Sequence, residues 1–275
     1  MKILFVAKKP EVWSALNPIL GVQAYAKGFE ANGHTVFRSH PKEGSAVLRR
    51  KANKCDFIFF CKLGQAEIVY RLGKPTACVY GDWRNRNNNN LKFHARADLF
   101  FPQFEMEGGK FLPAPIWADA FDPGRKRNGK WLWTGQRYRS KLFDGLRDRD
   151  VPLLPVRSSI YGYNRDRITG RDYIRVIETH SFGLSVSNRN DVQNYSSSRL
   201  GHYLMGGLTC CVRKFPGIEN LTPPGTFSYS TGEELQEFIK NPTSADPTTV
   251  HEYARSVYDG RVLAAQVIEE VEKMK

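Results

Sequence analysis

Short apolar runs of strand length alternate with helical segments along most of the chain, and this alternation constrains the fold more than any other feature. In the first half the apolar runs lie at 3–7, 34–38, 56–62, 76–80 and 99–101, with helical patterns at 17–31, 45–51 and 65–72. The apolar runs are continuous, as in strands that are buried on both faces. Such strands, separated by helices, predict an α/β fold with a parallel sheet covered on both sides.

The same pattern restarts after a segment typical of a linker. Residues 111–123 contain several prolines, and the run Gly124–Gly129 carries three basic side chains, which suits an exposed crossing. Further apolar runs lie at 131–134, 151–156, 182–187, 208–213 and 227–229, with helical patterns at 139–149, 171–180, around Arg199, after the capping box Thr231-Gly-Glu-Glu234, and at 248–273. Two Rossmann-like domains are therefore expected, at 1–122 and 123–250, followed by a closing helix at 251–275.

The net charge of +13 is unevenly distributed. Residues 1–175 contain 32 Lys and Arg against 16 Asp and Glu, whereas residues 176–275 contain 9 against 12. A polyanion is the natural partner of so basic a surface. The alternative is a soluble basic protein that needs a few cations for one nucleotide.

Composition also limits the class of protein. An apolar content of 41% excludes a disordered chain, and no apolar run approaches the roughly 20 residues that cross a bilayer. The start, Met1–Ala7, is too short for a signal peptide. The five cysteines lie in or beside apolar runs without metal-ligand spacing, which predicts buried reduced thiols and neither disulfides nor zinc. We therefore expect a cytoplasmic protein with no membrane partner.

The segment from Tyr195 to Glu219 carries the clearest functional signal. Three hydroxyl residues, Ser196, Ser197 and Ser198, precede Arg199 at the start of a helix, which a Gly-Gly pair ends before a buried strand and a Pro-Gly turn. A helix N-terminus presents unpaired N–H groups and a partial positive charge. With the serine hydroxyls and Arg199 added, the segment predicts a binding site for the diphosphate of a nucleotide or nucleotide sugar.

A second phosphate contact is predicted after the run at 131–134. Gly135 would let the backbone approach a phosphate, and three basic residues would supply counter-charge: Arg137, Arg139 and Lys141. Both segments would lie at the carboxyl edge of one parallel sheet, where nucleotides bind. The alternative is that this segment binds no phosphate, because a glycine at a strand end beside exposed basic residues is a common feature.

In the first half, Asp82 follows the run at 76–80 and would lie at the same kind of edge. Its carboxylate could take the proton of an acceptor hydroxyl, although an Asp that caps the following turn is the alternative. Several nearby residues could hold phosphates, read base edges or replace an extruded base: Lys8, Lys9, Trp13, Arg84, Arg86 and Asn87. They favour a nucleic acid acceptor over the alternative of a solvated polar loop.

Together these segments resemble GT-B glycosyltransferases, and in particular the phage DNA β-glucosyltransferase family. Tyr80-Gly-Asp82-Trp-Arg84 matches that family's aromatic-x-Asp-x-Arg motif, whose Asp is the catalytic base, and Gly135 with its basic neighbours matches a diphosphate cluster. Arg199 matches a phosphate-binding Arg, and the C-terminal motif is also similar to CgeB-like and family-4 glycosyltransferases. Where the family has a ribose-binding Glu, this chain has His202, so either His202 makes a weaker ribose contact or another residue makes it.

The resemblance implies two Rossmann-like domains facing a central cleft, an acceptor-binding one at 1–122 and a nucleotide-sugar-binding one at 123–250, with the C-terminal helix packed back on the first. It implies a hexosyltransferase that moves glucose from UDP-glucose to a 5-hydroxymethylpyrimidine, such as hydroxymethylcytosine, in double-stranded DNA of a bacteriophage, in the host cytoplasm. The transfer would be inverting, with Asp82 as base. Two alternatives remain: a GT-B enzyme acting on a cell-envelope glycan or a protein, and a non-catalytic nucleic-acid-binding module.

No metal or tightly bound cofactor is expected, although Mg²⁺ could assist departure of the leaving group. Asp148-Arg-Asp150 has the spacing of a metal motif, but it falls where a helix ends rather than after an apolar strand. A solvated charge cluster at a helix terminus is the expectation there. His94, His180 and His251 have no partner at ligand spacing and are expected to be structural or surface residues.

Overall fold

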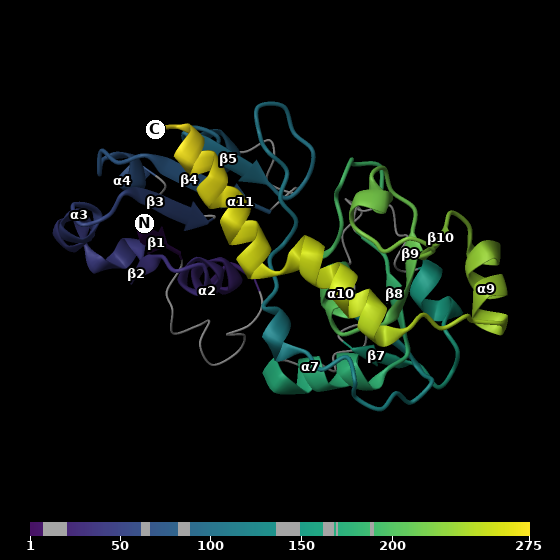
Figure 1. The fold of residues 1–275 in the computed structure, drawn as a ribbon. Coiled ribbons are helices and arrows are strands. Elements are labelled where there is room, and N and C mark those ends of the chain that lie inside the picture. The colour runs from purple at the N-terminus through teal and green to yellow at the C-terminus, as the bar shows by residue number, and fades with distance from the viewer. Residues whose placement is uncertain are drawn as a thin grey trace. The chain divides into compact units, whose positions relative to one another are not determined.

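The computed structural model describes residues 1–7, 21–61, 67–81, 89–135, 149–161, 168, 170–187 and 190–275. The chain forms two compact units (Figure 1). The first comprises Met1–Trp117 together with Tyr258–Lys275, and the second comprises Ala118–Val257. The sequence placed the two borders after residues 122 and 250.

The first unit contains a five-stranded parallel sheet with strand order β2-β1-β3-β4-β5. The strands are β1 (Lys2–Val6), β2 (Thr35–Ser39), β3 (Phe57–Cys61), β4 (Thr76–Tyr80) and β5 (Leu99–Pro102). The helices of this unit are α2 (Gln23–Ala31), α3 (Ser45–Ala52), α4 (Glu67–Tyr70), α5 (Asn89–His94) and α11 (Gly260–Lys273). Every residue of β3 and β4 is buried, as their continuous apolar character predicts.

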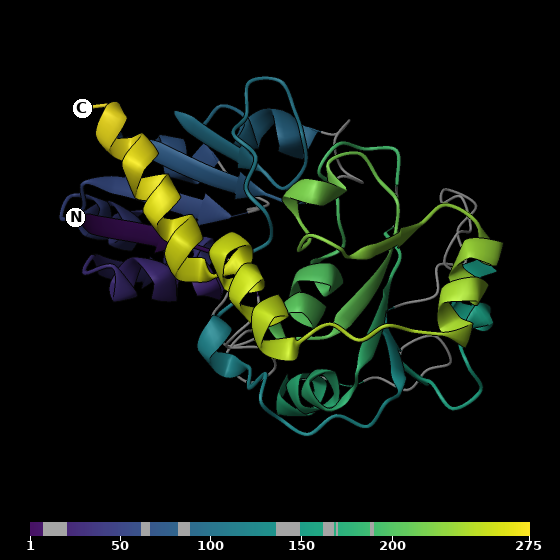
Figure 2. The same cartoon turned by 45° about the vertical axis from the view of Figure 1, so that its right-hand side comes forward.

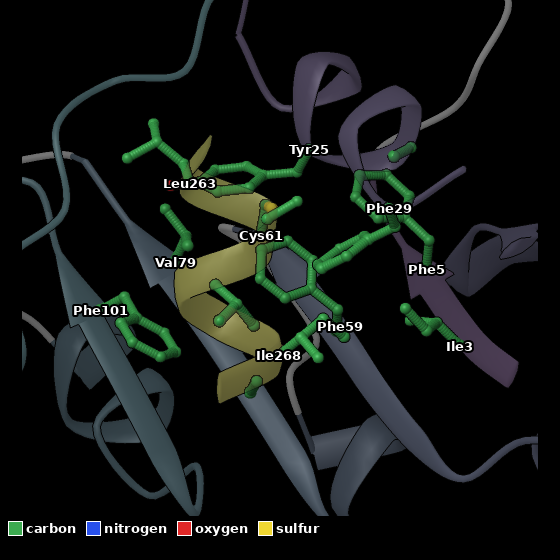
Figure 3. Packing of buried hydrophobic residues seen from close by; sticks show 14 of the residues in the cluster. Ile3, Phe5, Tyr25, Phe29, Phe59, Cys61, Val79, Phe101, Leu263 and Ile268 are labelled. Carbon is green, nitrogen blue, oxygen red and sulfur yellow. The ribbon is translucent and has the colours of Figure 1, made fainter. Parts of the chain in front are cut away.

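The C-terminal helix α11 belongs to the core of the first unit. Figure 3 shows Leu263 and Ile268 extending from α11 into a cluster that also contains Phe59 and Tyr25. A β-carbon added to Gly28 of α2 would lie 2.0 Å from the carbonyl oxygen of Gly260, so the backbones of α2 and α11 are in direct contact. The prediction that the last helix packs back on the first domain is therefore confirmed.

The closing helix is interrupted, whereas the sequence predicted one helix over 248–273. It consists of α10 (Pro247–Tyr258) and α11, drawn as two helical stretches in Figure 2. Between them Asp259 is extended, and its Oδ1 accepts a hydrogen bond from the Arg261 amide at 2.9 Å. The amide of Ile116 donates to the Tyr258 carbonyl, and the Gly260 amide donates to the Ile116 carbonyl, both at 2.8 Å. These two bonds to the backbone of Ile116, together with the cap formed by Asp259, explain why the helix is interrupted here.

The second unit contains another five-stranded parallel sheet, with order β10-β9-β8-β6-β7. Its strands are β6 (Trp131–Thr134), β7 (Ser159–Tyr161), β8 (Phe182–Ser185), β9 (Thr209–Arg213) and β10 (Phe227–Tyr229). Its helices, besides α10, are α7 (Gly170–Thr179), α8 (Ser198–Met205) and α9 (Gly232–Lys240). The predicted capping box opens α9, with Thr231 and Glu234 each bonding the other's backbone. The predicted parallel α/β character of both halves is confirmed.

Two local predictions are wrong. The strand expected at 151–156 is a short 3₁₀ turn over Val151–Leu153, and the strand lies later, at β7. Pro152 and Pro155 explain this, because proline has no N–H to donate within a sheet. The sequence predicted no helix over 89–94, where the structure has α5.

All five cysteines are buried, as predicted, and burial raises the pKa of the Cys61 and Cys210 thiols. Such thiols are inert at neutral pH. Within the residues that the structure describes, no helix has the length and apolar character that crossing a membrane requires.

Candidate anion-binding site of the second unit

Three chain segments meet at the carboxyl edge of the second sheet. Thr134 and Gly135 end β6, Val186 and Ser187 follow β8, and the N-terminus of α8 lies beside them. Because all five strands are parallel, every strand ends at this same edge. The fold therefore brings together the two segments from which the sequence predicts phosphate contacts.

Arg199, in the first turn of α8, is the central charge of this edge. It is only 6% exposed, its Nη1 donates to the Val186 carbonyl at 3.2 Å, and its guanidinium carbon lies 5.0 Å from the centre of the Trp133 ring. No carboxylate pairs with it within the described ranges. A buried guanidinium is costly without a counter-charge, so this arrangement suits an anionic ligand.

Gly135 lies directly against that guanidinium. A β-carbon at this position would lie 2.4 Å from Nη2 of Arg199 and 2.9 Å from the Trp133 ring. Any side chain would displace the arginine, so the glycine is required for the close packing. The predicted pair Gly135 and Arg199 is thus adjacent in the folded chain.

The three predicted serines differ in their surroundings. Ser197 is the N-cap of α8: its Oγ accepts a bond from the Arg199 amide at 3.4 Å, and its own amide donates to Ser187 Oγ at 2.9 Å. Ser196 is half-buried and Ser198 is exposed. The helix start still offers unpaired amides and a partial positive charge to an anion.

The loop that leads into α8 is held by the predicted Pro-Gly turn. The Asn194 amide donates to the Pro216 carbonyl at 2.8 Å, and Asn194 has a left-handed backbone with φ of 56°. A β-carbon on Gly217 would lie 2.1 Å from Asn194 Oδ1, so only glycine fits there. The turn therefore fixes the loop and, through it, the start of α8.

His202 lies one turn beyond Arg199 on α8, and its Nδ1 is 3.0 Å from the hydroxyl of Tyr173 on α7. Burial, and then the charge of Arg199, lower the pKa of His202 to about 3, so the imidazole is neutral at physiological pH. The buried hydroxyl of Tyr203, the next residue along α8, accepts a hydrogen bond from the Thr134 amide at 2.7 Å. In the described part of the site, the buried cation of Arg199 is therefore combined with neutral hydrogen-bonding groups.

Sequence reasoning missed Trp133, Tyr173 and Ser187. A signal existed for Trp133, because Trp131 and Trp133 alternate along one face of β6. Nothing local marks Tyr173, whose role depends on the neighbouring helix.

The remaining predicted site residues lie outside the described ranges. They are the proposed base, two arginines and a lysine of the diphosphate cluster, and the acceptor contacts: Asp82, Arg137, Arg139, Lys141, Lys8, Lys9, Trp13, Arg84, Arg86 and Asn87.

Asp150 does not belong to a solvated charge cluster, contrary to the prediction. It is 2% exposed, with Oδ2 lying 3.0 Å from Nη1 of Arg213 and 2.8 Å from the hydroxyl of Tyr229. This carboxylate connects the helical residues 149–150 to β9 and β10. Across the described residues, no group of three His, Cys, Asp or Glu side chains could hold a metal ion.

The three histidines are structural, as predicted for residues without ligand spacing. His180 is buried between the Val176 carbonyl, 2.6 Å from Nδ1, and Ser159 Oγ, 2.8 Å from Nε2. His251 binds the Met205 carbonyl through Nδ1, and the His94 ring packs against Phe60 and Tyr80.

Two parallel five-stranded α/β units, with the last helix returned to the first, define the GT-B fold of glycosyltransferases. Among solved structures, the chain is similar to AviGT4, a glycosyltransferase involved in avilamycin A biosynthesis, with a TM-score of 0.60 and 10% identity over 100% of this chain and 98% of that one. It is also similar to Anabaena HepE in complex with UDP-glucose, with a TM-score of 0.58 and 13% identity over 99% and 100%.

A third similar structure is the lipopolysaccharide outer core galactosyltransferase WaaB, with a TM-score of 0.56 and 11% identity over 100% of both chains. At these identities the likeness establishes the fold. No protein-family model matches the chain, and no curated protein matches it by sequence.

Proposed function

We propose that this chain is a glycosyltransferase that takes its sugar from a nucleoside diphosphate sugar, UDP-glucose, and binds the diphosphate at Arg199. The observation that carries the proposal is the buried guanidinium, which no carboxylate neutralises within the described chain, beside Gly135 and the N-terminus of α8. A diphosphate would supply the missing negative charge. The solved complexes of HepE with UDP and with UDP-glucose support the choice of donor.

In the proposed reaction the largest electrostatic demand is the charge that develops on the departing diphosphate. Arg199 and the α8 amides would stabilise it, with Ser196–Ser198 positioning it and His202 near the ribose. Three cations that the sequence predicts near the diphosphate, Arg137, Arg139 and Lys141, would add to this charge. We expect no tightly held cofactor, and removing Mg²⁺ with EDTA is expected to slow rather than abolish turnover.

We further propose that the acceptor is a 5-hydroxymethylpyrimidine in double-stranded DNA, bound by the first unit. Asp82 would take the proton of the hydroxymethyl group as its oxygen attacks the anomeric carbon and the bond to the diphosphate breaks, which inverts that carbon. The motif Tyr80–Arg84 and the net charge of +13 support this acceptor. The DNA contacts would come from Lys8, Lys9, Trp13, Arg84, Arg86 and Asn87.

The donor proposal is tested by calorimetric titration of UDP into the wild type and the Arg199→Met variant. Met keeps much of the side-chain length but lacks the charge. We expect at least a tenfold loss of affinity, since charge-assisted bonds contribute about 1.5–3 kcal/mol each. Arg213→Met, which removes a cation paired with Asp150 at 3.0 Å, is a control for general damage to this unit.

The acceptor proposal is tested by incubating the protein and UDP-glucose with duplex DNA containing hydroxymethylcytosine or hydroxymethyluracil. Mass spectrometry of the digested nucleosides is expected to show a hexose-sized gain on one base. Asp82→Asn is expected to lose this product while keeping UDP affinity. Equal loss of product and affinity would contradict the role of Asp82 as base.

A second acceptor class, a cell-envelope glycan or a protein, is favoured by one observation: the fold is shared with a lipopolysaccharide outer core galactosyltransferase. Retention on a duplex DNA column separates the two classes. A DNA-acting enzyme is expected to bind with steep salt dependence. UDP binding without DNA retention would favour the glycan or protein acceptor, and DNA retention without UDP binding would favour a non-catalytic nucleic-acid-binding module.

A further inference from the structure

Within the described part of the chain, one nitrogen of the His202 ring has a hydrogen-bond partner and the other has none. Nδ1 lies 3.0 Å from the Tyr173 hydroxyl, and the two rings pack edge to face with centroids 5.6 Å apart. For Nε2 no partner exists among the residues that the structure describes, and the side chain is partly exposed. Because residues three apart share one side of a helix, His202 and Arg199 present their side chains to the same region.

The neighbouring hydroxyl of Tyr203 is satisfied by Thr134 and so does not compete for His202. The Thr134 amide can only donate, and it donates to the Tyr203 hydroxyl oxygen at 2.7 Å. The buried Tyr203 hydroxyl must place its own hydrogen on an acceptor, and within the described chain that acceptor is Thr134 Oγ1, at 3.1 Å. Buried hydroxyls are nearly always satisfied in this way.

Among the residues that the structure describes, His202 Nδ1 is the one hydrogen-bond partner of the Tyr173 hydroxyl. A neutral imidazole has one unprotonated ring nitrogen, and the phenol hydrogen of Tyr173 finds an acceptor here when that nitrogen is Nδ1. The lone pair of His202 Nδ1, at 3.0 Å, is that acceptor. An imidazole that accepts at Nδ1 carries its proton on Nε2.

We infer that Tyr173 is a positioning residue that holds His202 in its Nε2-protonated form, so that Nε2–H donates a hydrogen bond to a ribose hydroxyl of the nucleoside diphosphate. This inference rests on the proposed nucleotide function. In this form His202 acts as a neutral hydrogen-bond donor beside the cation of Arg199. The neutral state is consistent with the lowered pKa of His202.

The first test is spectroscopic and needs no ligand. Long-range ¹H–¹⁵N correlation spectra of the nucleotide-free protein distinguish a protonated ring nitrogen from an unprotonated one, with His202→Gln used to assign the signals. The wild type is expected to show a single form, protonated on Nε2. Tyr173→Phe is expected to show a mixture of the two neutral forms.

The second test is a double-mutant cycle on UDP affinity, measured by calorimetric titration. Tyr173→Phe is expected to weaken binding about fivefold, and His202→Ala by at least as much. The double variant is expected to be no weaker than His202→Ala alone, because Tyr173 acts through the histidine. Tyr70→Phe, which removes a hydroxyl bonded to the Phe93 carbonyl in the first unit, is the matched control and is expected to leave affinity unchanged.

The outcomes separate this inference from the function on which it rests. If the wild type binds UDP but Tyr173→Phe changes neither affinity nor the ring signals, the positioning role is overturned and the nucleotide site stands. A wild type that shows the Nε2-protonated form but binds no nucleoside diphosphate would overturn the proposed function and, with it, the ribose contact.

Discussion

The guanidinium of Arg199 is stacked on the indole of Trp133, with 5.0 Å between the guanidinium carbon and the ring centre. Tryptophan is the aromatic residue that attracts cations most strongly. The stack and the Val186 carbonyl orient the arginine without cancelling its positive charge. An orienting surface that leaves the charge available is what a binding site for an anion requires.

Gly135→Ala is expected to weaken UDP binding at least tenfold. The new methyl group would lie 2.4 Å from Arg199 Nη2 and 2.9 Å from the rigid Trp133 ring, so the arginine must leave its stack. Calorimetric titration measures the loss, and thermal melting checks the fold. The control is Gly232→Ala, whose β-carbon comes no closer than 3.2 Å, to Leu153. Unchanged affinity of Gly135→Ala would show that the stack does not position a ligand contact.

Arg199→Lys tests orientation separately from charge. Lysine keeps the positive charge but has neither the planar face for Trp133 nor the forked donors that match a phosphate. We expect UDP affinity between those of the wild type and Arg199→Met, with roughly a fivefold loss from the wild type. If the lysine variant binds as tightly as the wild type, charge alone accounts for the site.

Gly28→Ala is expected to destabilise the first unit without affecting nucleotide binding. The added carbon would lie 2.0 Å from the Gly260 carbonyl oxygen, which is backbone and cannot rotate away. Overpacking costs about 1–3 kcal/mol, which outweighs the ~1 kcal/mol that alanine gains in a helix. Urea unfolding measures the change. The exposed Gly124→Ala, whose β-carbon would be 3.3 Å from the Asp122 carboxylate, is expected to be near neutral.

Elements whose environment follows from local sequence were predictable. The strands β4 and β6 have the bounds that their apolar runs predict, because a strand buried on both faces must be apolar throughout. The sequence also predicted the order of elements around α8, which is loop, helix, glycine stop, strand and turn. Caps and glycines act on their immediate neighbours, so local sequence is enough to predict them.

Elements that depend on distant partners were not predictable in the same way. The break at Asp259 requires the Ile116 backbone, and the burial of Asp150 requires Arg213 and Tyr229. The tautomer inferred for His202 depends on Tyr173, which belongs to another helix. In each case one residue's role is set by a contact that no local pattern records.

Arg127 illustrates this, because the sequence predicted an exposed charge run at Gly124–Gly129. Its guanidinium instead donates to the His180 carbonyl at 2.8 Å and the Gly206 carbonyl at 2.6 Å, at the ends of α7 and α8. Burial lowers the pKa of Arg127. Arg127→Ala leaves these carbonyls without a donor and is expected to cost about 1–3 kcal/mol in urea unfolding. Lys126→Ala, at an exposed position, is expected to change the free energy of unfolding little. Equal effects of the two variants would contradict a stabilising role for the bonds that Arg127 donates.

The neutral His202 predicts a loss of stability in acid. Its folded pKa, about 3, lies below the value of about 6.5 expected for the unfolded chain, so the unfolded state binds the proton first. The contribution is therefore fully present above about pH 6.5 and is lost as the pH falls from there toward 3. Its slope is at most about 1.4 kcal/mol per pH unit, and solvent at the partly exposed ring reduces it. Urea unfolding from pH 7.5 to 4.5 is expected to be less pH-dependent for His202→Gln than for the wild type, whereas parallel curves would show that His202 takes up its proton equally in both states.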